Sequence, residues 1–145
     1  MTDIQNVYFE SSILTASPVE LVRLLLRRAV ADVQHARERL REGDIAARAE
    51  AISHAAEVLT ELICALDEQS APVYAANAKR LYAYILERLL EGNCRQEDQP
   101  FAEAEGLLAD LASAWESMEE DQPAQAAQGA PYLVEPEFTF EACVA

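Results

Sequence analysis

The sequence is poor in the residues that break helices and form turns. Only four glycines and six prolines occur among its 145 residues, and they lie almost wholly at the ends of the chain and between periodic segments. The long runs between them consist of Ala, Leu, Glu and Arg, which all favour the α-helix. The chain is therefore expected to be all-α, and its length suits one domain with its own core.

Cysteine and histidine are also scarce. The three cysteines, Cys64, Cys94 and Cys143, are far apart and form no C-x-x-C pattern, so neither a disulfide framework nor a zinc site is predicted. The two histidines, His35 and His54, each lie three residues from a carboxylate, as the ligands of di-iron bundles do. The third and fourth expected helices lack the matching inward carboxylates, so we predict no metal and no cofactor.

The sequence contains no motif that is typical of catalysis or of membrane insertion. It has no Gly-rich phosphate loop, no G-x-S-x-G and no H-E-x-x-H segment, so we do not expect an enzyme. No apolar run approaches the roughly 20 residues that span a bilayer, and the N-terminus lacks the basic-then-apolar order of a signal peptide. These absences lead us to expect a cytoplasmic protein without membrane insertion.

Basic residues are few compared with acidic ones. The chain has 11 Lys and Arg against 26 Asp and Glu, a net charge of −15. Through Arg95 there are 11 basic and 14 acidic residues, and the other 12 acidic residues all follow without a basic one. Such a chain would repel phosphates, so no nucleic-acid partner is expected. The acidity serves solubility or, in a sharper interpretation, favours a neutral or basic partner.

Apolar residues recur every three or four positions in four segments, which predicts amphipathic helices at about 17–42, 44–67, 73–91 and 100–118. Helices of comparable length with short connections favour an antiparallel up-down-up-down four-helix bundle over residues 17–120. The stripe predicted for the second helix is Ile45, Ala49, Ile52, Ala56, Leu59, Ile63 and Leu66.

Two segments flank the predicted bundle. Residues 1–16 carry several large apolar side chains and are expected to form an arm that packs on the bundle. Residues 121–145 form an acidic Pro/Ala/Gln-rich tail with an apolar motif, which we expect to be disordered in isolation.

The predicted bundle has clear helix boundary signals at its N-terminal end. Ser17 can accept the backbone N–H three residues on, Glu20 can reach back to Ser17, and Pro18 stands where a missing N–H is harmless. Gly43 can end the first helix in a left-handed turn, and Asp44 can cap the second. These signals predict where helices start and stop, in proteins of any function.

Several segments of the chain together resemble one family. They are Tyr8-Phe9, Thr15-Ala16-Ser17-Pro18-x-Glu20-Leu21, Leu62 to Asp67, Leu81-Tyr82-x-Tyr84-Ile85 and Ala114-Trp115. In this order and spacing they resemble the FliS family of flagellar secretion chaperones over roughly residues 7–118. The segment Leu24-Leu25-Leu26-Arg27-Arg28 departs from the family's Met-Leu-Tyr-Asp-Gly-like pattern.

The resemblance implies a cytoplasmic export chaperone. Its client would be the C-terminal segment of flagellin, kept from polymerising early and delivered to the flagellar type III export apparatus, with an export gate component as a further candidate partner. The candidate contact residues are Tyr8, Phe9, Ile13, Leu14, Ala16 and Pro18, followed by Leu81, Tyr82 and Ile85.

Two alternatives stay open at this point. Tyr8 and Phe9 could simply cap one end of the bundle, and Tyr82, Tyr84 and Trp115 are expected in or beside the core because each lies on or next to an apolar stripe. The alternative function is that of a non-catalytic, homodimerising helical-bundle protein with an interaction or regulatory role, whose tail inserts into its own or a neighbour's groove. The chain is expected to be a monomer or a weak homodimer.

Overall fold

The computed structural model describes residues 6–7 and 17–121. The second range contains four helices and no strand: α2 (Pro18–Glu42), α3 (Ile45–Cys64), α4 (Pro72–Arg95) and α5 (Asp98–Asp121). This confirms the all-helical prediction. Nearly all of the predicted arm and tail lies outside the described residues.

The predicted cap residues act as expected, but the return bond of the capping box is not formed among the described residues, because the Glu20 carboxylate accepts from Arg23 at 3.2 Å. The Ser17 hydroxyl accepts the backbone N–H of Glu20 at 3.2 Å. Gly43 ends α2 with a φ of 77°, in the left-handed region that glycine adopts without strain. Asp44 accepts the backbone N–H of Ala47 at 3.1 Å and so caps α3. Two residues therefore suffice to connect α2 with α3.

The C-terminal end of α4 differs from the prediction. The helix was predicted to end near residue 91, before Gly92, but it continues to Arg95, and Gln96 ends it with a φ of 57°. Gly92 lies inside the helix and leaves room for Phe101, because a Cβ at this position would lie 2.8 Å from the Phe101 ring. The glycine marks a close approach of α5 to α4, which sequence spacing alone does not distinguish from a helix end.

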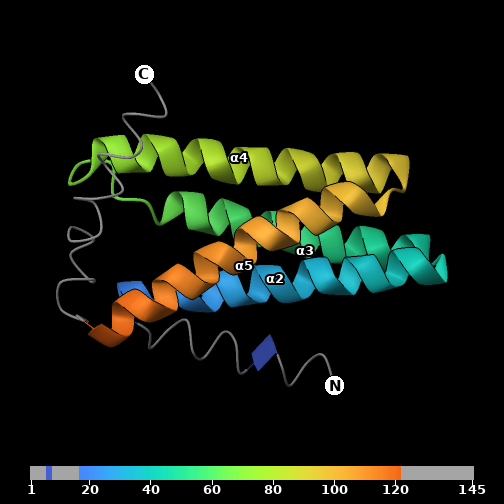
Figure 1. The fold of residues 1–145 in the computed structure, drawn as a ribbon, viewed down its shortest axis with the longest axis horizontal. Helices are drawn as coiled ribbons and strands as arrows, with labels where there is room; N and C mark the ends of the chain where they lie inside the picture. Colours follow the sequence, from blue (N-terminus) through green and yellow to red (C-terminus); the bar gives the residue numbers. More distant parts are fainter. Residues whose placement is uncertain (1–5, 8–16, 122–145) are drawn as a thin grey trace.

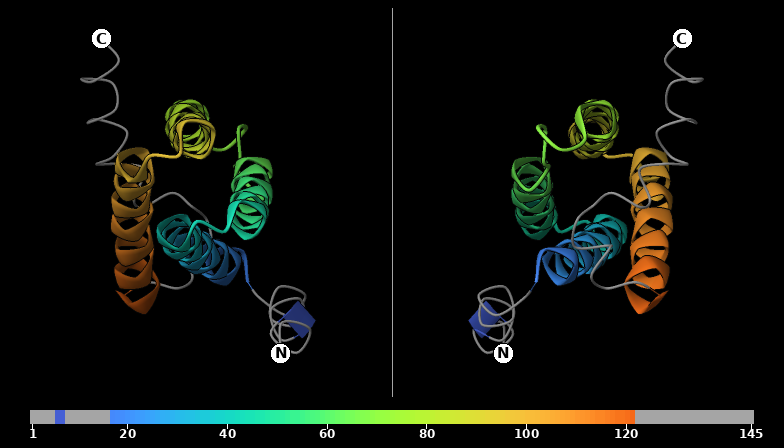
Figure 2. Two further views of the ribbon diagram at one scale, coloured as in Figure 1. Left: turned by 90° about the vertical axis from the view of Figure 1, so that its right-hand side faces the viewer. Right: turned by 90° about the vertical axis from the view of Figure 1, so that its left-hand side faces the viewer.

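The four helices surround a common core. Each helix packs against the next in the chain, and α5 also packs against α2, so the end views in Figure 2 show a ring in the order α2, α3, α4, α5. In Figure 1 the sequence colours run to the right along α2 and α4 and to the left along α3 and α5, and α5 crosses the front obliquely. α5 therefore contacts both α2 and α4.

The buried face of α3 is displaced from its predicted apolar stripe. Ile45 is 57% exposed, and of the predicted α3 stripe only Ile52 and Leu59 are buried. Arg48 accounts for this displacement. It is a charged residue, so it is not part of the apolar stripe, yet it lies on the buried side of α3. The residues of α3 that are buried are Arg48, Ala51, Ile52, Ala55, Val58, Leu59 and Leu62.

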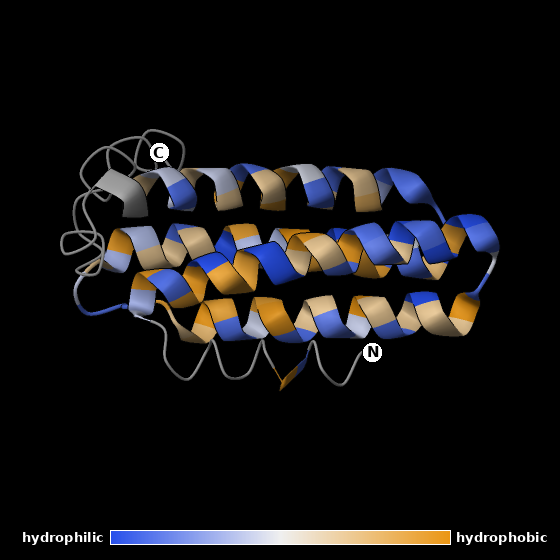
Figure 3. Cartoon of the chain, turned by 90° about the horizontal axis from the view of Figure 1, so that it is seen from below, coloured by the Kyte–Doolittle hydropathy of each residue, from blue (hydrophilic) through white to orange (hydrophobic). Residues whose placement is uncertain are grey.

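No helix in the described part of the chain is long and apolar enough to cross a membrane. Figure 3 shows why, since hydrophilic positions interrupt the hydrophobic ones along every helix. This alternation is what a helix needs when one side faces a protein core.

Candidate functional site

The predicted contact residues are spread over the arm, the start of α2 and α4. Tyr8, Phe9, Ile13, Leu14 and Ala16 lie outside the described residues. Pro18 is exposed at the first position of α2. The contact role predicted for this group stays a prediction.

The three candidates on α4 lie at different depths. Leu81 is half-buried, whereas Tyr82 is 3% exposed and Ile85 is fully buried. A direct contact between a partner and Tyr82 or Ile85 would therefore require the bundle to open. Of these three residues, only Leu81 presents part of its side chain to the surface.

Two aromatic residues join α4 to α5 within the core. Trp115 is buried, as predicted. Burial raises the pKa of the half-buried Tyr74 phenol, and a hydrogen bond with the Trp115 side chain acts in the opposite direction. This pair ties the start of α4 to the last turns of α5.

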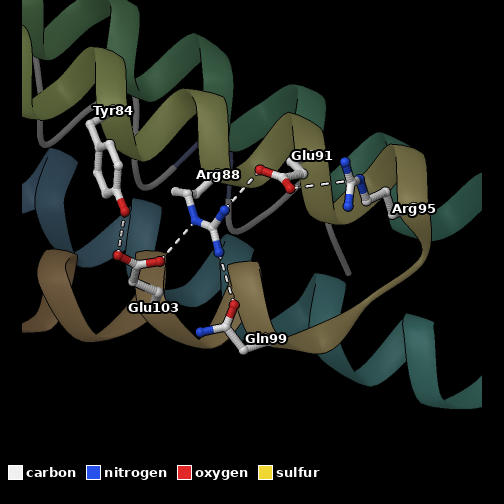
Figure 4. Close-up of polar contacts among 6 residues, drawn as sticks. All are labelled: Tyr84, Arg88, Glu91, Arg95, Gln99 and Glu103. Carbon is white, nitrogen blue, oxygen red and sulfur yellow. Dashed lines mark hydrogen bonds and ion pairs between the residues drawn. The ribbon is translucent and has the colours of Figure 1, made fainter.

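A polar cluster on the surface joins the same two helices nearer the other end (Figure 4). The Tyr84 hydroxyl donates to Glu103 at 2.5 Å, and Arg88 donates to Glu103, Gln99 and Glu91 at 2.8 Å each. The hydrogen bonds from Tyr84 and Arg88 lower the pKa of the Glu103 carboxyl. Tyr84 is 41% exposed, so it lies farther from the core than predicted.

Arginines of α2 hold α5 from the other side. Arg37 donates from two nitrogens to the two carboxylate oxygens of Asp98 and from the third to Glu105, all at 2.7 Å. Arg27 donates to Glu116 at 2.8 Å. The hydrogen bond from Arg37 lowers the pKa of Asp98. Since α5 has no basic residue, much of its acidity is matched by arginines of neighbouring helices.

The buried Arg48 connects α3 to the end of α4. It is 3% exposed and donates to the side-chain oxygen of Asn93 at 2.8 Å and to the Asn93 carbonyl at 3.2 Å. A cation at this point complements the negative end of the α4 dipole. Sequence reasoning missed Arg48. Its spacing of four from Ile52 and seven from Ala55 fits the same side of a helix, but a charged residue does not indicate burial by itself.

Asp32 is the second buried charged residue. Its Oδ1 atom accepts from Arg28 at 3.2 Å, whereas Oδ2 is buried without a hydrogen-bond partner. Desolvation raises the pKa of this carboxyl, and Arg28, His54 and His35 partly offset the effect. No group of three or more metal-binding side chains occurs in the described part of the chain.

These features define a small helical-bundle protein whose helices are joined by arginine–carboxylate clamps around an apolar core. A sequence model of the family described as Flagellar protein FliS matches residues 1–122. The chain belongs to the FliS family.

Curated relatives give the same assignment. The chain is 36% identical to the flagellar secretion chaperone FliS of Salmonella typhimurium over 114 residues, which cover 78% of this chain and 84% of the relative. It is 28% identical to the flagellar secretion chaperone FliSB of Pseudomonas aeruginosa over 81% of this chain and 94% of the relative. For the FliS of Bacillus subtilis the identity is 27%, over 77% of this chain and 85% of the relative.

Proposed function

We propose that this chain is a cytoplasmic flagellar secretion chaperone that binds the C-terminal segment of flagellin. The observation that carries the proposal is the family match over residues 1–122, together with 36% identity to a relative named flagellar secretion chaperone. Binding would prevent premature polymerisation and support delivery of flagellin to the type III export apparatus. A chaperone of this kind acts by association, with no bond made or broken.

The bundle is physically suited to such a task. A segment that later forms the core of a filament exposes apolar helix faces, and an amphipathic helix of this kind can lie in a groove between two helices. Ordering the segment would consume roughly 2–5 kcal/mol of the gross interaction, so we expect an extended contact along several helices. The predicted arm residues, led by Tyr8, and the half-buried Leu81 are the proposed contacts at one part of this surface.

A polymerisation assay tests the proposal. Flagellin monomers seeded with filament fragments should stop elongating when the chain is added at equimolar concentration, because the C-terminal segment is then occupied. Flagellin that lacks this segment should not co-elute with the chain in gel filtration. Unchanged elongation at a large excess of the chain would contradict the proposed function.

A further inference from the structure

On its flank toward α4, helix α3 carries a stripe of apolar residues. These residues are partly exposed to solvent. Ile45, Ala49, Ala56 and Ile63 share this flank because they are four or seven residues apart. Ile45 is exposed and the other three are half-buried. The stripe lies away from α2, since His54, on the opposite flank, is the α3 residue whose charge acts on a carboxyl of α2.

The adjoining flank of α4 continues this apolar surface. Leu86 is half-buried, Ala83 is exposed and Leu90 is 52% exposed. They lie on the side of α4 opposite Tyr84 and Arg88, which contact α5. No described helix covers this side, because α3 and α4 are neighbours in the ring and have α2 and α5 on their other sides.

The two flanks meet at one end of the molecule. Arg48 of α3 contacts Asn93 of α4, and Ile45 and Leu90 each lie three residues before one of these two residues. Ile45 and Leu90, two of the exposed large hydrophobic residues of the described chain, therefore belong to one surface. We define the α3–α4 face as Ile45, Ala49, Ala56, Ile63, Ala83, Leu86 and Leu90.

Carboxylates border the α3–α4 face. Glu50, Glu57 and Glu61 are exposed on α3, and Glu87 is exposed on α4. The ion pairs between described residues include none of these four. Two cations lie on the same side of α4: Lys79, which pairs with Glu68, and the exposed Arg80. The four carboxylates without an ion pair outnumber the one cation without one, so the border of the apolar surface is acidic on balance.

The negative charge beside the α3–α4 face indicates which kind of partner can bind there. A second copy of the chain would bring the same carboxylates against each other, and the chain's own tail, which carries Glu135, Glu137 and Glu141, would be repelled as well. A helix with basic residues beside its apolar stripe would match both features. Small side chains at Ala49, Ala56 and Ala83 would let its backbone approach closely.

We infer that the α3–α4 face binds an amphipathic client helix whose apolar stripe is flanked by Lys or Arg. The inference rests on the proposed function only in naming flagellin as the source of that helix. The helix lies along the α3–α4 face, its apolar side chains on Ile45, Leu86 and Leu90 and its basic side chains toward the bordering carboxylates. Steering by these charges makes its association sensitive to salt.

Matched lysine substitutions at two exposed alanines test this inference. Ala83→Lys places a cation on the α3–α4 face, whereas Ala109→Lys places the same cation at an exposed position of α5. Calorimetry with a flagellin C-terminal peptide should show affinity weakened by about tenfold or more for the first variant, because a charge is buried against an apolar stripe. The second variant should bind like the unsubstituted chain. Equal affinities of the two variants would overturn the inference while leaving the proposed function intact.

A pair of designed helical peptides separates the inference from the identity of the client. Both carry one leucine stripe, flanked by lysines in one peptide and by glutamates in the other. The lysine-flanked peptide should bind more tightly, and Ala83→Lys should weaken it selectively. If the two peptides bind equally, the inference is wrong whether or not flagellin binds.

An exposed free thiol reports where the peptide lies. Cys94 is exposed and follows Leu90 by four residues, on the same side of α4. Its modification by a thiol reagent, followed by mass spectrometry of the cleaved chain, should slow when the lysine-flanked peptide is bound. An unchanged rate at saturating peptide would place the peptide elsewhere and contradict the inference.

Discussion

Asp32 is the residue at which burial and charge oppose each other most directly. Its carboxyl is buried on α2 with one oxygen unpartnered, and desolvation outweighs Arg28 and the two histidines, so its pKa is raised. A carboxyl with a raised pKa keeps its proton in the folded state when the unfolded chain has lost it. Its contribution to the free energy of unfolding therefore falls as pH rises through the interval between the two pKa values.

Asp32→Asn tests this competition. The variant has no proton to lose, so its free energy of unfolding should fall less than that of the unsubstituted chain as pH rises from about 4, the ordinary carboxyl pKa. The difference should appear in urea unfolding curves recorded at successive pH values. If the free energy of unfolding of the two proteins changed with pH in the same way, the raised pKa of Asp32 would be contradicted.

Asp98→Asn is the matched control, because the pKa of Asp98 is lowered by Arg37. The stability that this pair provides is present above the ordinary carboxyl pKa and is lost as pH falls through the lowered value. The variant should therefore lose stability at neutral pH, by about 1 kcal/mol or less because both side chains are partly exposed. Its deficit should shrink in acid.

At the scale of the helix, two glycines inside helices have opposite surroundings. A Cβ added at Gly92 of α4 would lie 2.8 Å from the Phe101 ring, whereas a Cβ at Gly106 of α5 would meet nothing within 4 Å. Gly106→Ala should stabilise the bundle by about 0.5–1 kcal/mol through helix propensity and reduced freedom of the unfolded chain. Gly92→Ala should destabilise it by about 1–3 kcal/mol through overpacking.

Chemical denaturation of both alanine variants measures this contrast. The two substitutions are chemically identical, so a difference in sign can only come from their surroundings. If Gly92→Ala stabilised the bundle as much as Gly106→Ala does, the close contact between α4 and Phe101 would be refuted.

Local signals predicted most of the helices, and long-range contacts explain the exceptions. The caps at Ser17, Gly43 and Asp44 depend on neighbours in sequence, so the sequence alone was sufficient. The buried side of α3 depends on Arg48 reaching Asn93 of α4, and no periodicity of α3 contains that contact. The same limit applies to Gly92 of α4, because the need for a glycine at this position comes from the Phe101 ring of α5.

The candidate site was less predictable than the fold for the same reason. A stripe of apolar residues shows that one side of a helix is buried or bound, but not which flank meets a neighbouring helix. Tyr82 and Ile85 are therefore inside the core although they were named as contacts, while Ile45 and Leu90 are exposed although apolar. Only the packing of α3 beside α4 brings the last two together.

At the scale of the whole molecule, the carboxylates of α5 and those beside the α3–α4 face differ in whether arginines pair with them. The acidic α5 is held by Arg27 and Arg37 of α2 and by Arg88 of α4, so part of the net charge of −15 is matched within the bundle. The carboxylates beside the α3–α4 face are matched by no described residue. We therefore expect the bundle to keep its clamps when a basic-flanked helix binds.

The central claim is that the chain acts by holding the C-terminal segment of flagellin. Isothermal titration of that segment into the chain, under reducing conditions and moderate salt and at several temperatures, tests it most directly. The account predicts saturable binding with a negative heat-capacity change, because apolar surface is buried, and no binding of a flagellin N-terminal segment of equal length. A C-terminal segment that produces no saturable binding at any temperature would contradict the account.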